Sequence, residues 1–133
     1  MKVQTYLMFD GRCEEALDFY KKALGVSVGM VMRFKDSPDP ESCPPGAENK
    51  IMHAAFDIGD TTVMASDGYC RGQTNFQGFS LALSVKDESE ADKAFAALGD
   101  GGKVEMPLAQ TFFSKRFGIV SDRFGVSWMV LVE

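Results

Sequence analysis

Apolar and polar residues alternate along several short stretches of this chain, the pattern of strands that bury one face. The predicted strands are 3–9, 26–34, both arms of a hairpin over 51–66 that turns near Gly59-Asp60, 79–85, 103–108, 117–121 and 126–132. Two other stretches, 13–25 and 87–99, place apolar residues three or four positions apart, as an amphipathic helix does. The chain therefore combines helices with many short strands.

The ends of both predicted helices have typical signals. Glu14 and Glu15 suit the positive end of the first helix, and Gly25 suits the residue just past its end. In the second helix, Asp87 followed by Glu90 resembles a capping box, and Gly99 ends the pattern. The side chains predicted to be buried in this second helix are Ala91, Ala94, Phe95 and Leu98.

The order strand, helix and three strands occurs twice. The helices end in the similar strings "KALG" at 22–25 and "AALG" at 96–99, which indicates an internal duplication. We therefore predict an α+β fold in which tandem βαβββ repeats form a curved mixed sheet, a cup, with the helices on its outer face. Residues 1–133 form one domain in this prediction, with repeat 1 at about 1–67, a linker at about 68–77 and repeat 2 at about 78–133. A proline-rich stretch, 35–49, is predicted to be a long exposed loop.

Alternation assigns side chains to the two faces of the predicted sheet. In 79–85 the large apolar residues occupy odd positions and face the helix, whereas Ser80, Ala82 and Ser84 point away. By the same reasoning His53, Ala55 and Asp57 share the second face, and so do Ser127, Met129 and Leu131. That face would line the cup if the sheet curls. The alternative is a solvated sheet face or a dimer contact.

Composition narrows the class of protein. The chain has 133 residues, 45% of them hydrophobic and 25% charged, which is ordinary for a globular protein. Its net charge of −5 argues against a nucleic-acid partner. No apolar run approaches the roughly 18 residues of a membrane span, and the apolar run at the N-terminus is short for a signal peptide, so we expect neither. Cys13, Cys43 and Cys70 show no CxxC spacing, so reduced thiols and a cytoplasmic location are predicted.

At this point the chain resembles a known superfamily. Paired βαβββ units, with "YLMFDGRCEEALDFYKKALG", "MHAAFDIGDTTVMASD" and "FGIVSDRFGVSWMVL" in this order, resemble the vicinal oxygen chelate superfamily. It includes glyoxalase I, fosfomycin and bleomycin resistance proteins and extradiol dioxygenases. The resemblance is strongest to the PhnB-like branch, whose domain is also called 3-demethylubiquinone-9 3-methyltransferase, and it covers almost the whole chain.

The resemblance implies where a metal would bind. Metal-dependent members hold a divalent ion in the cup with His or Glu ligands, two from each half. Alignment on the shared motifs places Thr5, Met64, Ser80 and Met129 at those positions. Hydroxyl and thioether groups without an anionic ligand are a poor set for such ions. We therefore expect no metal and no other cofactor.

His53, the only histidine, is the candidate general base, because histidine side chains titrate near neutral pH. The resemblance supports this role, since PhnB-like proteins usually have a histidine at this point of the hairpin. The alternative is a structural strand histidine. Asp57 is too far along the strand to contact it directly. The resemblance also places 110–118 at the mouth of the cup. There Phe113 could stack on a ligand and Arg116 could hold an anion, although PhnB-like proteins commonly have Trp at Phe113 and Gly at Ser114.

The sequence gives weaker support to a reactive cysteine and to methyl transfer. Cys13 begins a helix, where a thiolate is favoured, but it lies on the apolar stripe, so buried packing is the preferred interpretation. The sequence does not support a methyltransferase activity, because it shows no glycine-rich turn between a parallel strand and a helix.

The sequence thus predicts a metal-free protein that binds a small organic molecule in the cup, as a homodimer, with Ser127 among the residues lining it. One alternative is an enzyme of lyase, isomerase or dioxygenase type with His53 as general base. Another is an acidic, dimeric drug-binding protein similar to bleomycin-resistance proteins. A cup filled by the protein's own side chains would instead indicate a structural or interaction domain.

Overall fold

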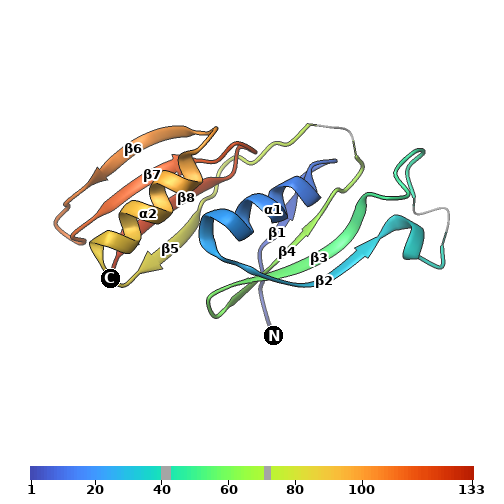
Figure 1. Ribbon diagram of the computed structural model, residues 1–133, viewed down its shortest axis with the longest axis horizontal. Helices are drawn as coiled ribbons and strands as arrows, with labels where there is room; N and C mark the ends of the chain where they lie inside the picture. Colours follow the sequence, from blue (N-terminus) through green and yellow to red (C-terminus); the bar gives the residue numbers. More distant parts are fainter. Residues whose placement is uncertain (40–42, 71–72) are drawn as a thin grey trace. The chain divides into compact units, whose positions relative to one another are not determined.

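The computed structural model describes residues 1–39, 43–70 and 73–133, which form two compact units. Unit 1 spans Met1–Thr74 and unit 2 spans Asn75–Glu133. Each unit contains one strand, one helix and then three strands (Figure 1). The α+β class and the tandem βαβββ order predicted from the sequence are confirmed.

Unit 1 is a four-stranded mixed sheet with one helix. Its strands lie in the order β1-β4-β3-β2, with β1 parallel to β4 and the other pairs antiparallel. A single 3₁₀ turn, η1 (Phe34–Asp36), follows β2. The bounds are β1 (Tyr6–Met8), α1 (Cys13–Leu24), β2 (Ser27–Arg33), β3 (Ile51–Ile58) and β4 (Thr61–Ser66).

Unit 2 repeats this topology. Its strand order is β5-β8-β7-β6, and β5 is parallel to β8. In both units the first strand therefore lies beside the last one, and the helix belongs to the crossover that a parallel pair requires. The bounds are β5 (Leu81–Val85), α2 (Glu88–Gly99), β6 (Lys103–Ala109), β7 (Phe117–Ser121) and β8 (Ser127–Val132).

Some boundaries differ from the prediction. The strand predicted at 3–9 is regular only over Tyr6–Met8, because this is the part that pairs with β4. Pairing of β5 begins at Leu81 opposite Trp128, so Phe79 and Ser80 precede the strand. The predicted loop 35–49 includes residues 40–42, and the predicted linker 68–77 includes residues 71–72, which lie outside the described part of the chain.

The first helix packs on one face of its sheet. Cys13, Ala16, Leu17, Phe19 and Tyr20 are its buried residues, and the Tyr20 ring stacks on Phe56 of β3 with ring centroids 5.8 Å apart. Gly25 has a φ of 66° and donates its N–H to the Lys21 carbonyl, the helix end predicted from the sequence. This side of the sheet is the core of unit 1.

The second helix has half of the predicted capping box. The Asp87 carboxylate accepts a hydrogen bond from the Glu90 N–H at 2.8 Å. The Glu90 carboxylate, however, accepts from the N–H of Lys86 rather than from that of Asp87. Ala91, Ala94 and Leu98 are buried as predicted, while Phe95 is half-buried above Gly118 of β7.

Neither helix, in the part of the chain that the structure describes, has the length and apolar character needed to cross a bilayer.

Candidate functional site

Each sheet has one face that its own helix does not cover, which we call the helix-free face of the unit. In unit 1 the helix side carries buried residues such as Leu7, Ala54 and Val63, so their neighbours along each strand form the helix-free face. Its members include Tyr6, Met8, Met32, His53, Ala55, Asp57, Thr62, Met64 and Ser66. Apolar and hydrogen-bonding side chains are mixed there.

The helix-free face of unit 2 follows from the same alternation. Trp128, Val130 and Val132 are buried on the helix side, as predicted. The predicted second face, Ser127, Met129 and Leu131, is half-buried. Its neighbours by register are Ala82, Ser84, Phe117, Ile119 and Ser121.

Met64 and Met129 occupy equivalent places in the two units. Met64 pairs with Tyr6 on the parallel strand and with Ala55 on the antiparallel strand. Met129 pairs with Ala82 on the parallel strand and with Ile119 on the antiparallel strand. Both thioethers therefore belong to the centre of a helix-free face, between two other strands.

His53 contacts a residue that the sequence did not single out. The Tyr6 hydroxyl lies 2.8 Å from His53 Nδ1, and the two ring centroids are 5.5 Å apart. Burial raises the pKa of Tyr6, which keeps its hydroxyl protonated. Asp57, on the same face, accepts a hydrogen bond from the Thr62 hydroxyl at 2.6 Å.

The serines named from the sequence meet in unit 2. Ser80 Oγ and Ser127 Oγ lie 2.7 Å apart, one just before β5 and the other at the start of β8. Phe113 is exposed and contacts Phe117 edge-on, with centroids 5.1 Å apart, so it lies next to the helix-free face.

Two other predicted site residues lie elsewhere. The Arg116 guanidinium forms an ion pair with Asp92 of α2 at 3.3 Å, which directs it toward the helix side. Thr5 precedes β1, and its carbonyl accepts the N–H of Met64. Ser114, adjacent in sequence to Phe113, bonds through its hydroxyl to the Val132 carbonyl at 2.7 Å.

The residues at the superfamily's metal positions do not fit a divalent ion. Ser80 is hydrogen-bonded to Ser127, and Met64 and Met129 offer only thioether sulfur. Among the described residues, no three His, Cys, Asp or Glu side chains lie close enough together to hold an ion. No chemistry can therefore be derived through a metal in either unit.

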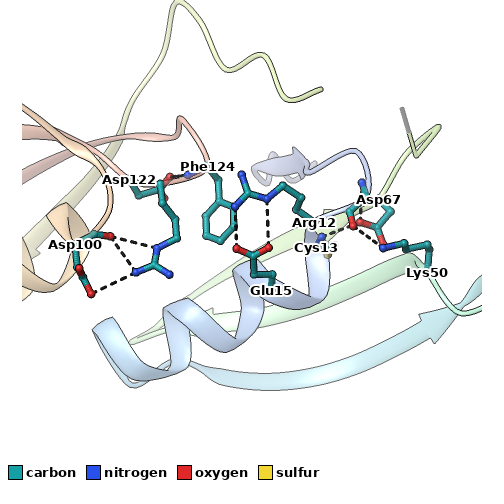
Figure 2. A network of polar contacts seen from close by, with 10 residues as sticks. Arg12, Cys13, Glu15, Lys50, Asp67, Asp100, Asp122 and Phe124 are labelled. Carbon is teal, nitrogen blue, oxygen red and sulfur yellow. Dashed lines mark hydrogen bonds and ion pairs between the residues drawn. The ribbon is translucent and has the colours of Figure 1, made fainter. Parts of the chain in front are cut away.

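A buried carboxylate, which the sequence analysis placed at the edge of a polar linker, joins β1, α1 and β3. Asp67 is 1% exposed, and its Oδ1 accepts the N–H groups of Gly11 and Cys13 at 2.9 and 2.7 Å. Its Oδ2 accepts the N–H of Ile51 at 2.7 Å. Figure 2 shows Asp67 beside Cys13 at the start of α1. The sequence signal was an Asp directly after an alternating strand and before a glycine, which is typical of a turn-forming acceptor.

Asp122 has a similar role in unit 2. It is 4% exposed, and its Oδ1 accepts the N–H groups of Phe124 and Val126 (Figure 2). Its Oδ2 accepts Trp128 Nε1–H at 2.9 Å. The turn between β7 and β8 is thereby fixed to the indole that fills the core of unit 2.

Cys13 is buried, as the preferred interpretation of the sequence stated. Burial raises the pKa of its thiol, and the nearby Asp67 carboxylate raises it further. In the unfolded chain the thiol ionises near pH 8.5, whereas in the folded chain it stays protonated. Proton release therefore stabilises only the unfolded chain as the pH rises.

We expect the free energy of unfolding to fall above about pH 9, with a Cys13 contribution that approaches about 1.4 kcal/mol per pH unit. Urea titrations at pH 7 to 10 measure the Cys13 contribution as the difference in the pH dependence of the free energy of unfolding between the wild type and Cys13→Ala. Cys43→Ala, a change of a half-buried cysteine, should keep the wild-type slope. Equal slopes for Cys13→Ala and the wild type would show that the Cys13 thiol does not control this pH dependence.

The fold is shared with glyoxalase-related proteins. A glyoxalase-related enzyme from Fulvimarina pelagi superposes with a TM-score of 0.64 at 15% identity, over 100% of this chain and 88% of that one. Similarity at this level of identity shows the fold alone. The glyoxalase fold is thus the structural class of the protein.

Closer relatives define the family. The family described as 3-demethylubiquinone-9 3-methyltransferase matches residues 1–131. Protein YjdN of Escherichia coli (strain K12) is 34% identical over 140 aligned positions, which cover 99% of this chain and 95% of that protein.

Two solved structures agree with this match. Protein PA1353 from Pseudomonas aeruginosa is 40% identical, with a TM-score of 0.87 and coverage of 100% of this chain and 98% of that chain. The PhnB protein from Bacillus cereus is 32% identical, with a TM-score of 0.82 over 100% of both chains. The chain belongs to the 3-demethylubiquinone-9 3-methyltransferase family, the PhnB-like group that the sequence resembles.

Proposed function

We propose that this protein binds a small organic molecule on the helix-free faces of its sheets, without the divalent metal of the wider superfamily. The observation that carries the proposal is the equivalent placement of Met64 and Met129, each in the middle of a helix-free face. Thioether side chains are apolar, polarizable and adaptable, so they suit an organic ligand better than an ion. The homodimer, the cytoplasmic location and the absence of a nucleic-acid partner stay predictions.

Hydrogen-bonding groups beside these methionines support the same proposal. Small-molecule sites are mostly apolar, with a few polar groups that fix the orientation of the ligand. Tyr6 and His53 supply such groups in unit 1, and Ser80 and Ser127 supply them in unit 2. These side chains are partly exposed, so a ligand could reach them.

An enzyme of lyase, isomerase or dioxygenase type is the second candidate function, because the His53 imidazole is partly exposed on the helix-free face. Methyl transfer has less support, because each sheet contains a single parallel pair and neither is the doubly wound parallel sheet that binds nucleotide cofactors. The acidic, drug-binding alternative rests on the net charge of −5 and on the shared fold.

Methionine methyl NMR tests the proposal, because the chain has eight methionines and they lie on different surfaces. The probes are acetophenone, benzoate and benzylamine, which share a ring and differ in their polar group. We expect at least one probe to shift the methyl resonances of Met64 or Met129 in a saturable manner. The methyl of Met52, which alternation places on the opposite face of β3 from His53, should stay unchanged.

A matched pair of variants locates the binding surface. Met129→Lys places a charge on the helix-free face of unit 2, and we expect probe binding there to weaken at least tenfold. Val3→Lys makes a similar change at a 94% exposed position and should leave binding unchanged. Absence of any probe-induced shift at the helix-free methyls would contradict the proposal. Stoichiometric divalent metal in protein purified without a histidine tag would contradict its metal-free part.

A further inference from the structure

A hydrogen bond on the helix-free face of unit 1 joins Tyr6 to His53. The Tyr6 hydroxyl lies 2.8 Å from His53 Nδ1. Ser66 lies on the same face, where its Oγ accepts the N–H of Gly68 at 2.8 Å. Ser66 is 4% exposed, so this part of the face is closed to water.

The register of the strands explains why these groups meet. Tyr6 on β1 pairs with Met64 on β4, whereas Ser66 is two residues further along β4 on the same face. Ala54 pairs with Ala65, so His53 and Ser66 are the next residues outward on β3 and β4. The Tyr6 side chain therefore reaches diagonally across β4 to His53.

The chemistry of the two groups sets the direction of the hydrogen bond between Tyr6 and His53. A phenol is a stronger hydrogen-bond donor than acceptor, whereas the unprotonated nitrogen of a neutral imidazole is a strong acceptor. The Tyr6 hydroxyl therefore donates its proton to His53 Nδ1. A neutral imidazole with Nδ1 as acceptor carries its proton on Nε2. Nε2 has no hydrogen-bond partner among the described residues.

We propose that His53 presents an N–H donor at Nε2 and that it recognises a neutral carbonyl oxygen of the bound molecule. This deepens the proposed function and rests on it. A neutral carbonyl is favoured over a carboxylate, because the described residues of this helix-free face include no lysine or arginine that could pair with an anion, and its one charged member, Asp57, is acidic. A ligand amine is disfavoured, because an N–H at Nε2 offers it no acceptor. In this tautomer Nε2 is not a general base.

The tautomer can be measured directly, since His53 is the only histidine. Long-range ¹H–¹⁵N correlation of ¹⁵N-histidine protein at pH 8 should show a protonated Nε2 and an unprotonated Nδ1. Tyr6→Phe removes the hydroxyl but keeps the ring, and we expect a mixture of both tautomers in this variant. Tyr69→Phe, which removes a hydroxyl from a 75% exposed tyrosine, should leave the wild-type spectrum unchanged. A protonated Nδ1 in the wild type overturns the inference.

The same probes test the ligand class. Acetophenone should shift the Nε2 resonance of His53 together with the Met64 methyl, and Tyr6→Phe should weaken its binding about fivefold. Benzoate should bind more weakly than acetophenone, and benzylamine should leave Nε2 unchanged. Stronger binding of benzoate, or a shift of Nε2 by benzylamine, overturns the carbonyl assignment.

Failure of this inference can be distinguished from failure of the proposed function. If probes shift the methyls of the helix-free faces but never His53 Nε2, the ligand does not bind through His53 and the proposed function stands. If no helix-free methyl shifts with any probe, the proposed function fails, and the carbonyl assignment fails with it.

Discussion

Replacement of Asp67 by Asn should destabilise the protein by about 3 kcal/mol. Asp67 uses both carboxylate oxygens, one for the N–H groups of Gly11 and Cys13 and the other for that of Ile51. An asparagine has only one acceptor oxygen, so at least one buried N–H would lose its acceptor and face another donor. Urea unfolding followed by far-UV circular dichroism measures the change.

Asp60→Asn is the matched control for this prediction. It makes the same chemical change at an exposed position of the β3–β4 turn. We expect it to alter the free energy of unfolding by less than about 0.5 kcal/mol. If Asp67→Asn were equally mild, the three hydrogen bonds of Asp67 would contribute little to holding α1 and β3 together.

Replacement of Gly118 by Ala should cost about 2–3 kcal/mol. A Cβ atom at Gly118 would lie 2.8 Å from a ring carbon of Phe95, and 2.9 Å from the Met106 carbonyl oxygen. The Phe95 ring could rotate away, but the carbonyl belongs to β6, which would have to separate from β7. Urea unfolding followed by the fluorescence of Trp128, the only tryptophan, reports directly on unit 2.

Gly29→Ala provides the control within a strand. A Cβ atom there would meet only the Ala55 carbonyl oxygen, at 3.6 Å, which is ordinary contact. We expect a change of less than about 0.5 kcal/mol, because alanine fits at this position and also restricts the unfolded chain. An equal effect at both glycines would argue against tight packing of α2 on β7.

The secondary structure of this protein could be predicted because its signals are local. Apolar spacing and a C-terminal glycine define α1, and alternation separates Trp128 and Val130 from Ser127 and Met129. The ends of the strands were predicted less accurately, because a strand ends where its pairing with the neighbouring strand ends. The sequence around Phe79 resembles a strand, but β8 offers no partner there and β5 starts at Leu81.

The candidate site was only partly predictable, because its contacts join residues far apart in the chain. Tyr6 and His53 are 47 positions apart, and their contact depends on a diagonal reach across β4 that spacing cannot reveal. Arg116 was predicted as an anion ligand, but its direction depends on Asp92 of another element. Asp67 lies at the predicted boundary between repeat 1 and the linker, and nothing local shows that its carboxylate oxygens accept hydrogen bonds from α1 and β3.

The pairing of β1 with β4 has a consequence for synthesis on the ribosome. Met8 pairs with Ser66, and the N–H groups of Gly11 and Cys13 donate to Asp67. The first strand and the start of α1 therefore gain these partners only from the end of β4 and the residue after it. Contacts this distant in sequence form slowly. We expect α1 to emerge from the exit tunnel with its first turn unsupported until Asp67 has emerged as well. Stalled nascent chains cut before β4 should therefore be more sensitive to protease than chains cut after Thr74.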